Sequence, residues 1–281
     1  MTYREGYQQG YQVLFDAGVS DAKLDARLLL EYVCGTTQHD IILNGNRVLT
    51  YDEVASYEEV IAKRASRIPL QHIIGSQEFM GYTFQVNENV LVPRQDTEVL
   101  VEEALQYVKP GMSVLDMCTG SGCILLSILA LGKDITGTGV DISTSALAVA
   151  TENAKQISTQ AGKELNHAFL ESNLFEKVKG KFDVIVSNPP YIKSAVIDTL
   201  EPEVRLHEPL SALDGTSDGL YFYEKIITES RDYLNENGIL LFEIGHDQGE
   251  AVSALMRKAG FKEVYVKKDY ARLDRVVAGF F

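Results

Sequence analysis

Residues 182–192 read FDVIVSNPPYI, and the architecture of the larger part of the chain follows from this stretch. The β-branched residues 184–186 come after a Gly-Lys turn and predict a buried strand. The two prolines cannot continue that strand inside a sheet, because each one removes a backbone donor and fixes φ. Asn188 precedes the first proline and is therefore held in an extended conformation. We expect a stiff ledge at the carboxyl end of the strand, where open α/β sheets bind their ligands.

The ledge carries groups that suit a planar NH2 group. The Asn188 side-chain oxygen and the Pro189 carbonyl oxygen accept hydrogen bonds, and Tyr191 has a flat aromatic face. Two acceptors can hold both hydrogens of a carboxamide or an exocyclic amine while the ring stacks on its plane. Such positioning fixes the nitrogen for in-line attack and favours the positive charge that develops on it. The alternative is that the prolines only end a loop and that Tyr191 only packs.

Length and charge limit the classes of protein. The chain has 281 residues, enough for one large domain and one small domain. The net charge of −14 argues against a wide basic face for nonspecific nucleic-acid binding. The three cysteines form no even disulfide set and read as reduced thiols of a cytoplasmic protein. Neither they nor the five histidines have a metal-ligand spacing, and no apolar run is long enough to span a membrane.

The first part of the chain is predicted to be helical up to about residue 67. A helix over residues 3–17 is followed by one with Ser20 as its N-cap and Gly35 as its stop. A further helix opens with a capping box formed by Thr50 and Glu53. The residues leave open whether this unit is a structural cap on a larger domain or a protein-docking module.

After the helical part, the spacing of the apolar residues changes to the alternation of a β-strand. Apolar and polar residues alternate over residues 82–86, and a turn and the apolar residues 90–92 follow. This pattern predicts a β-hairpin between two domains. Asp96 or Thr97 can then cap a helix. Arg94 precedes this helix, and it is either a surface charge or a partner for a ligand carboxylate.

A glycine-rich turn follows the first strand of the larger domain. The strand over residues 113–117 runs into Cys118-Thr119-Gly120-Ser121-Gly122, and a helix over residues 124–130 follows. The order of strand, glycine-rich turn and helix is a nucleotide-binding geometry, because glycines let the backbone approach the ligand closely. The turn is neither a P-loop nor the full dinucleotide fingerprint.

Polar residues end the next two strands. Asp141 follows the strand over residues 135–140, about 20 residues after the turn, which is the position of a carboxylate that binds ribose hydroxyls. The alternative for Asp141 is a helix-capping role, and Ser143 is a plausible cap for the helix that follows. After a strand over residues 167–170, Asn173 is placed to bond an adenine edge with Leu174 packing on the ring. Asn173 could equally be a turn residue.

The rest of the chain completes an α/β pattern. A long polar stretch runs to Gly219, and loops of that length are usually functional or mobile. We then expect a helix over residues 221–234, a strand over 238–243 and a helix over 248–259. Residues 264–266 and 275–278 should close the sheet as an antiparallel pair.

Taken together, these motifs resemble the HemK-type release-factor glutamine methyltransferases, the PrmC family, over nearly the whole chain. The resemblance implies an α/β fold with a Rossmann-like class I methyltransferase domain over residues 96–281, built on a mostly parallel seven-stranded sheet. It also implies an all-helical domain over residues 1–75 that docks the release factor, and a β-hairpin linker over residues 76–95. The matching segments are residues 71–75, 92–98, 115–122, 140–143 and 187–192, with Glu208-Pro209 and Ala212-Leu213.

The resemblance also implies a reaction. The cofactor is S-adenosylmethionine, which becomes S-adenosylhomocysteine, and the substrate is the glutamine of the Gly-Gly-Gln loop of peptide chain release factors. We expect a direct transfer that needs neither a strong base nor a metal, and we expect neither direct nucleic-acid binding nor a membrane to be involved. The implied catalytic residues are Asn188, Pro189 and Tyr191, with Pro190 added for substrate binding. The implied cofactor-binding residues are Arg94, Asp116, Cys118, Thr119, Gly120, Ser121, Gly122, Asp141, Ile142, Asn173, Leu174 and Asn188.

Three residues depart from the family pattern. Gln95 stands where the family usually has proline, Cys118 where it has glycine and Asn173 where it has aspartate. Two other activities use a similar ledge: adenine amino-methyltransferases of nucleic acids and glutamine methyltransferases of a ribosomal protein. The acidic balance argues against the first, and a basic groove facing Tyr191 would favour it. The second is a close relative that sequence separates poorly.

Overall fold

The computed structural model describes residues 1–281, which form two compact units. The first unit contains Met1–Gly75 and the short segment Glu201–His207. The second contains Ser76–Leu200 and Glu208–Phe281. No helix of either unit has the length and apolar character needed to cross a bilayer.

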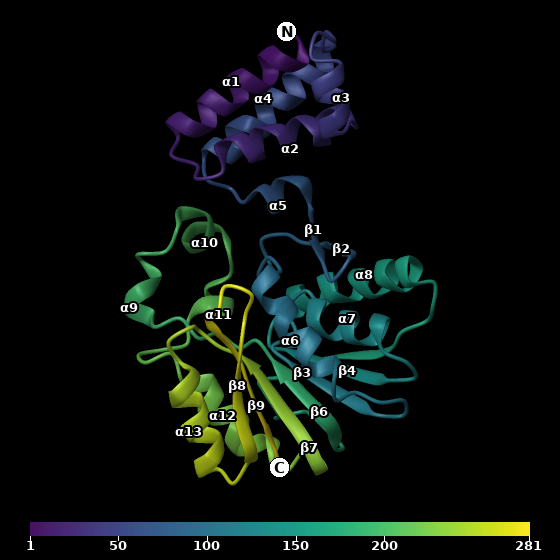
Figure 1. The fold of residues 1–281 in the computed structure, drawn as a ribbon, viewed down its shortest axis with the longest axis vertical. Helices are drawn as coiled ribbons and strands as arrows, with labels where there is room; N and C mark the ends of the chain where they lie inside the picture. The colour runs from purple at the N-terminus through teal and green to yellow at the C-terminus, as the bar shows by residue number, and fades with distance from the viewer. The chain divides into compact units, whose positions relative to one another are not determined.

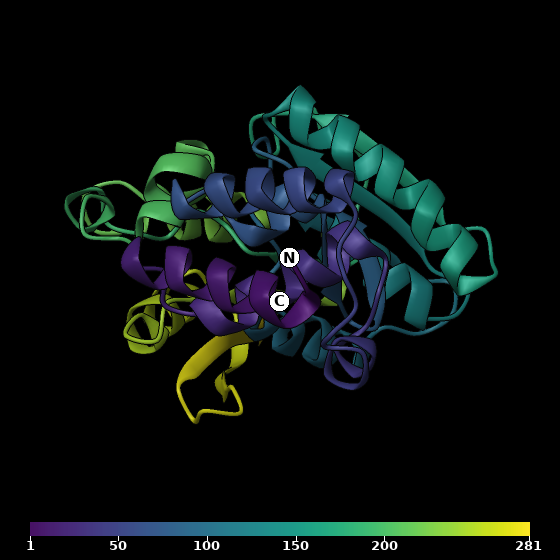
Figure 2. The ribbon, with the colours of Figure 1, turned by 90° about the horizontal axis from the view of Figure 1, so that it is seen from above.

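The first unit is helical. Helices α1, α2 and α4 lie side by side around a core that includes Leu14, Leu30 and Tyr57 (Figure 1 and Figure 2). Thr50 caps α4 as predicted, since its hydroxyl accepts a hydrogen bond from Glu53 N and the Glu53 carboxylate accepts one from Thr50 N. The helices are α1 (Tyr3–Asp16), α2 (Ala22–Cys34), α3 (Gln38–Leu43), α4 (Tyr51–Ala65), α5 (Leu70–Ile74) and α10 (Pro202–His207).

The predicted cap of the second helix is wrong. Asp21 occupies the N-cap position of α2, and its side chain makes no capping bond. The residues after Gly18 form a turn through positions 20 and 21, so the first helical position falls at Ala22. The predicted stop is confirmed, because Gly35 adopts a left-handed conformation with φ of 57°.

Ion pairs hold the segment Glu201–His207 in the first unit. Glu203 accepts from Arg64 Nη2 at 2.8 Å and from Arg67 Nε at 2.8 Å and Nη2 at 2.6 Å. The Arg64 Nε donates to Asp25 Oδ2 at 2.7 Å on the other side. Burial disfavours the charge on Glu203, but the two guanidinium groups outweigh it and lower the pKa of Glu203 to about 2. A carboxylate held by two arginines therefore assigns this segment to the helical unit.

The second unit is built on a seven-stranded sheet of order β5-β4-β3-β6-β7-β9-β8 (Figure 1). The first five strands in that order are parallel, and β9 runs antiparallel to both of its neighbours. The predicted mostly parallel sheet and its antiparallel final pair are confirmed. The strands are β3 (Ser113–Met117), β4 (Thr136–Asp141), β5 (Asn166–Glu171), β6 (Phe182–Ser187), β7 (Leu234–Glu243), β8 (Lys262–Lys268) and β9 (Asp274–Phe280).

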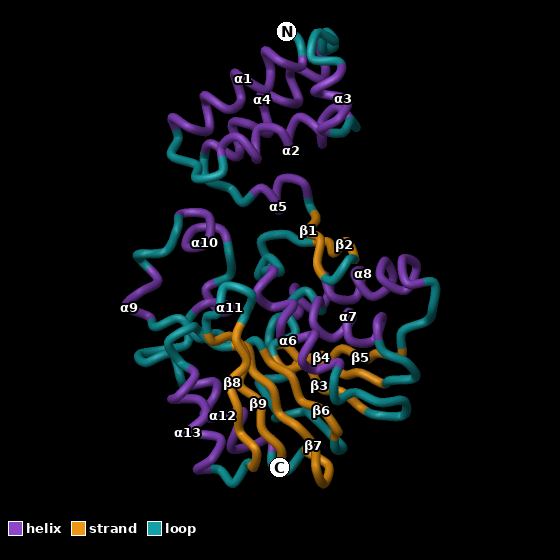
Figure 3. Tube along the Cα trace, viewed as in Figure 1, coloured by secondary structure: helices purple, strands orange, loops and turns teal.

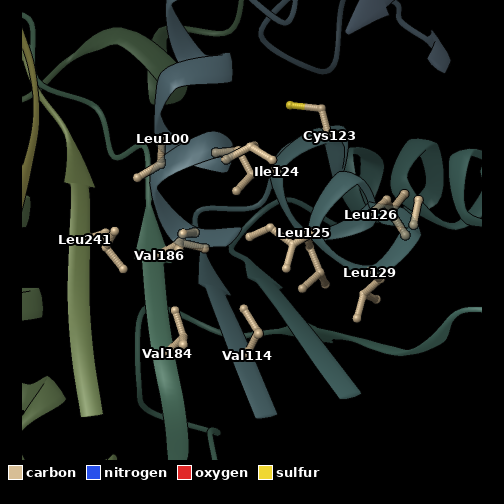
Figure 4. Packing of buried hydrophobic residues seen from close by; sticks show 14 of the residues in the cluster. Leu100, Val114, Cys123, Ile124, Leu125, Leu126, Leu129, Val184, Val186 and Leu241 are labelled. Atoms are coloured by element: carbon tan, nitrogen blue, oxygen red, sulfur yellow. The ribbon is translucent and has the colours of Figure 1, made fainter. Parts of the chain in front are cut away.

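Helices cover both faces of this sheet. On one face, Val114, Val184 and Val186 pack against side chains of α6 and α7, among them Leu100 and Ile124 (Figure 4). The alternate strand residues form a second cluster with α12 and α13 on the other face, as the period of two in a strand requires. The helices are α6 (Gln95–Leu105), α7 (Cys123–Leu131), α8 (Thr144–Ala161), α12 (Tyr221–Ser230) and α13 (Gly249–Lys258).

The hairpin lies earlier in the chain than predicted. It pairs β1 (Ser76–Phe79) with β2 (Tyr82–Gln85) through a two-residue turn in which Met80 and Gly81 both have positive φ. Residues 90–92 form no strand. The free edge of β2 is instead satisfied by side chains of α8, since Gln85 N donates to Asn153 Oδ1 at 2.7 Å. No third strand is needed there.

Two further elements differ from the prediction. Helix α6 begins at Gln95 with Arg94 at the N-cap, so neither Asp96 nor Thr97 is the cap, and both lie in the first turn. The stretch before Gly219 is not a plain loop. It contains the short helices α9 (Ser194–Ile197), α10 and α11 (Leu210–Leu213) (Figure 3).

Candidate active site

A cavity of about 540 Å³ opens where four parallel strands of the second unit end. The carboxyl ends of β3, β4, β5 and β6 each contribute side chains to it. Its wall also includes residues 89–91 and parts of α11 and α12, and it contains no lysine or arginine. The predicted residues that line it are Cys118, Gly120, Asp141, Ile142, Asn173, Leu174, Asn188 and Pro190.

The turn after β3 is made of residues in the left-handed region. Cys118, Gly120 and Gly122 have φ of 65°, 54° and 78°. A Cβ on Gly120 would meet nothing, whereas one on Gly122 would lie 3.0 Å from Leu126 and 3.2 Å from Ala150. The first glycine therefore serves the backbone conformation, and the second also allows α7 and α8 to approach.

Asp116 stabilises this turn through a hydrogen bond to Thr119. Its side chain is fully buried and accepts a hydrogen bond from the Thr119 hydroxyl at 2.6 Å, while its Oδ1 has no partner. Burial raises the pKa of Asp116 to about 7. Asp116, Thr119, Ser121 and Gly122 do not line the cavity but shape the residues that do.

Asp141 connects the turn to the next strand. Its Oδ2 accepts from Gly120 N at 2.9 Å, and its Oδ1 accepts from Ser143 N at 2.9 Å. Burial raises the pKa of Asp141, and the Ser143 and Gly120 amides oppose that rise. Ser143 caps α8 through a bond from Ala146 N, so Asp141 is not the helix cap. Asp141 lines the cavity, and each of its carboxylate oxygens accepts one recorded hydrogen bond, so lone pairs remain for hydroxyl donors.

The segments after β4 and β5 contribute both apolar and polar side chains to the cavity region. Leu174 has a positive φ of 48° and lines the cavity, as does the exposed side chain of Ile142. The Asn173 amide donates to Glu176 Oε1 at 2.8 Å, which leaves its own oxygen as an acceptor. The three side chains present two apolar surfaces and one polar edge.

The ledge after β6 is held tightly. Asn188 and Pro190 line the cavity, whereas Pro189 and Tyr191 do not. The Tyr191 carbonyl accepts from Gln248 Nε2 at 3.2 Å, and a Cβ on Gly215 would lie 2.7 Å from Tyr191 Cα. The backbone around Tyr191 therefore has little freedom to move.

Side chains behind the ledge were missed by sequence reasoning. Tyr191 donates its hydroxyl to Glu243 Oε1 at 3.3 Å, and Asn188 Nδ2 donates to Thr97 Oγ1 at 3.5 Å. Glu243 ends β7, next to β6, and both Glu243 and Thr97 are 3% exposed. A signal was available, because Glu243 follows an apolar strand in the same way that Asp141 does. Gln248 comes five residues later and had no comparable signal.

Arg94 lies beside an acidic partner. Its Nη2 is 2.6 Å from Glu208 Oε1, and the Glu208 side chain is 1% exposed. Burial raises the pKa of Glu208, and the Arg94 guanidinium opposes that rise. Arg94 is not among the residues that line the cavity.

Comparisons with known proteins show the family of the chain. The PrmC N-terminal domain family matches residues 5–75, and the methyltransferase small domain family matches residues 95–201. A release factor glutamine methyltransferase of Caulobacter vibrioides is 45% identical over 268 residues, which cover 95% of this chain and 92% of the relative. The chain belongs to the release factor glutamine methyltransferase family.

Further comparisons are consistent with that membership. The Geobacter sulfurreducens member is 40% identical over 274 residues, covering 97% of this chain and 94% of that one. A methyltransferase structure from Pyrococcus furiosus superposes with a TM-score of 0.54 at 16% identity, over 78% of this chain and 98% of that chain, which supports the fold alone. The resemblance inferred from the motifs is thus confirmed, and the protein is a methyltransferase.

One departure from the family pattern now has a structural consequence. Cys118 stands in the left-handed region, where a side chain costs about 1–2 kcal/mol that glycine does not. Burial also raises the pKa of its thiol, which keeps the sulfur neutral in the cavity wall. Gln95 is simply the first residue of α6, after Arg94 at the N-cap.

Proposed function

We propose that this enzyme transfers a methyl group from S-adenosylmethionine to the side-chain amide nitrogen of the glutamine in the Gly-Gly-Gln motif of peptide chain release factors. The observation that carries the proposal is the rigid ledge at the end of β6, whose Asn188 lines the same cavity as Asp141. One acceptor-holding side chain and the carboxylate proposed to hold the cofactor thus belong to residues of one cavity. The family to which the chain belongs supports the choice of substrate.

The cavity residues fit the cofactor. A volume of about 540 Å³ lies within the range of cofactor sites, roughly 300–1,000 Å³. The Asp141 carboxylate would accept from ribose hydroxyls, and Ile142 with Leu174 would enclose the adenine. The left-handed turn at Gly120 would let the backbone approach the ligand closely. When bound, S-adenosylmethionine supplies an electrophilic methyl group on a sulfonium.

The ledge residues would orient the acceptor. Asn188 Oδ1 and the Pro189 carbonyl accept the two N–H bonds of the glutamine amide, and Tyr191 packs against its plane. An amide nitrogen is a poor nucleophile because its lone pair is delocalised. Two fixed acceptors favour the positive charge that grows on it, so the stabilisation is larger in the transition state than in the ground state. The methylated nitrogen then loses its proton to water.

We assign partner docking to the helical unit. It lacks any candidate catalytic group, and the match to the PrmC N-terminal domain family covers residues 5–75. Several large apolar side chains at α3 and the start of α4 are exposed, including Ile42 at 67%, Leu43 at 72% and Tyr51 at 88%. A folded partner could cover them.

The residues that line the cavity bear on the two alternative substrates. A nucleic-acid strand would need cations for its phosphates, and no lysine or arginine lines the cavity. A glutamine of a ribosomal protein would use the same ledge, so it is the second candidate and differs only in docking.

The test is a mapping experiment. The enzyme is incubated with labelled cofactor and purified release factor, and the labelled residue is identified by mass spectrometry. We expect one methyl group on the glutamine of the Gly-Gly-Gln motif, and none when that glutamine is replaced by alanine. Parallel reactions contain ribosomal proteins or an adenine-containing oligonucleotide. Label on either of these and none on the release factor would overturn the proposal.

A further inference from the structure

The cavity has a second carboxyl group that the chemistry described so far does not use. Asp214 lines the cavity together with Asp141, whereas no lysine, arginine or histidine does. The remaining lining residues have apolar, hydroxyl, amide or sulfur-containing side chains, apart from one glycine. A cavity wall that bears carboxylates and no cationic group favours a positively charged ligand.

The segment that carries Asp214 is fixed to the chain that follows the ledge. Ile192 N donates to Leu213 O at 3.0 Å, and Gly215 N donates to Ile192 O at 2.8 Å. A Cβ on Gly215 would lie 2.7 Å from Tyr191 Cα, so the two stretches of backbone are in close contact. These contacts hold Asp214 beside the end of the ledge.

The carboxyl group of Asp214 is oriented through one of its oxygens. Its Oδ1 accepts from Ser194 Oγ at 2.7 Å and from Thr216 N at 2.9 Å. Its Oδ2 has no donor and is not one of the buried polar atoms that lack a partner, so it stays accessible. Two bonds to one oxygen restrict the rotation of the group. The cavity wall therefore contains a carboxylate with a fixed position and one free oxygen.

The proposed methyl donor and its product differ by one unit of charge. At pH 7, S-adenosylmethionine has a sulfonium, an ammonium and a carboxylate group, and thus one net positive charge. As the amide nitrogen bonds to the methyl carbon, the bond from that carbon to sulfur breaks, and its electron pair stays on sulfur. The product S-adenosylhomocysteine is a thioether whose ammonium and carboxylate charges cancel. The positive charge passes to the amide nitrogen and leaves as a proton to water.

We propose that Asp214 is a specificity-determining residue, whose carboxylate favours the positively charged methyl donor over its neutral product. The inference rests on the proposed function, because that function places the sulfonium beside the ledge, where Asn188 holds the acceptor. Hydrogen bonds from ribose hydroxyls to Asp141 cannot make this distinction, since both ligands contain the ribose. Specificity is a difference of two affinities, and the charge of Asp214 acts at the group that the reaction changes.

The first test is Asp214→Asn in the full chain. Asparagine keeps an oxygen for the donors on Ser194 and Thr216, so the variant loses the charge with little change of shape. Calorimetry measures the dissociation constants of S-adenosylmethionine and S-adenosylhomocysteine. We expect the affinity for the methyl donor to fall about tenfold and that for the product to change less than about twofold. The scale is that of unit charges about 10 Å apart at an effective dielectric constant of about 20.

Asp218 supplies a matched control in the same segment. Its Oδ1 accepts from Leu220 N at 2.9 Å, a bond to the residue two positions on, like the bond from Thr216 N to Asp214. Asp218 is exposed and does not line the cavity. Asp218→Asn should leave both dissociation constants unchanged. Equal losses of affinity for the methyl donor in the two variants would reveal an effect of net charge alone and would overturn the role of Asp214.

A third ligand separates the charge from the methyl group. In this analogue of S-adenosylmethionine, a carbon that bears a primary amine replaces the methylated sulfur, so the ligand is cationic at pH 7 and has no methyl group to transfer. We expect Asp214→Asn to weaken its binding as much as that of S-adenosylmethionine. If it behaves like the product, or if all three ligands lose affinity alike, Asp214 does not sense the charge and the inference is wrong.

These measurements separate the inference from the proposed function, because they use no release factor. An unchanged ratio of the two dissociation constants in Asp214→Asn overturns the inference alone. A wild-type enzyme that binds both ligands but leaves release factor unmethylated overturns the proposed function, and an enzyme that binds neither ligand overturns both.

Discussion

The backbone amide of Gly120 donates a hydrogen bond of 2.9 Å to Asp141 Oδ2, so the glycine-rich turn after β3 and the end of β4 are joined directly. Asp141 is also one of the residues that line the cavity. One side chain thereby shapes the turn and offers acceptors to a ligand.

Asp141→Ala should therefore weaken cofactor binding by about 1.5–3 kcal/mol, the range for hydrogen bonds to a charged group. Asp141→Asn keeps one acceptor oxygen and should lose less. Calorimetric titration with S-adenosylmethionine measures both. Unchanged affinity in the alanine variant would remove Asp141 from the binding site.

Asn188→Ala should lower kcat by about 10²–10³ with little change in cofactor affinity, because in the proposed mechanism its oxygen stabilises charge that appears only as the methyl group arrives. Asn188→Asp keeps the acceptor and loses the NH2 group that bonds to Thr97. If acceptance alone matters, the aspartate variant retains much more activity than the alanine variant. Steady-state kinetics on release factor distinguish them, and wild-type rates in both would disprove the amide-holding role.

Glu203 should make the helical unit sensitive to acid. Its folded pKa of about 2 lies below the ordinary value of 4.5, so its stabilising contribution is present above pH 4.5 and is lost as pH falls toward 2. That shift corresponds to at most about 3 kcal/mol, and solvent screening of this partly exposed side chain reduces the contribution. Urea unfolding at several pH values should show a gap between wild type and Glu203→Gln that narrows over that window.

Glu201 supplies the control for that experiment. Its carboxylate is 3.0 Å from Arg67 but its side chain is 69% exposed, so the pair is worth only about 0–1 kcal/mol. Glu201→Gln should unfold nearly like wild type at every pH. A gap for Glu203→Gln that does not change with pH would show that its charge is not what holds the segment.

Substitutions of Cys118 test the cost of a side chain in the glycine-rich turn after β3. Cys118→Gly relieves the left-handed strain but adds unfolded-state entropy, and the two effects of about 1 kcal/mol each should nearly cancel. Cys118→Val places a β-branched residue at the same φ and should destabilise by about 1–3 kcal/mol. Chemical denaturation measures both, and a valine variant as stable as wild type would contradict the strain argument.

Docking by the helical unit predicts a substrate-dependent effect. Leu43→Ser removes an exposed apolar side chain of α3 and should raise KM for intact release factor, but not for a short peptide that carries the Gly-Gly-Gln motif. Leu273→Ser, at a 45% exposed position of the second unit, is the control and should change neither. Equal KM values for intact release factor in all three proteins would argue against docking through α3.

The local sequence alone was enough to predict several strands, the glycine-rich turn and the ledge of this enzyme. Runs of β-branched residues mark buried strands, glycines mark the turn after β3, and paired prolines mark the ledge after β6. Each of these signals lies within a few residues, where φ restrictions and the side-chain period act directly. Asp141 was found in the same way, because an acidic residue after an apolar strand is visible without knowing the sheet order.

Contacts between distant positions could not be derived in that way. Thr97 and Asn188 are 91 residues apart and Arg67 and Glu203 are 136 apart, and no periodicity connects them. Glu243 meets Tyr191 only because β6 and β7 are neighbours, and the hairpin ends at Gln85 because α8 satisfies its free edge. Strand order and edge pairing are properties of the folded chain, since they depend on which buried surfaces and backbone groups find partners across space.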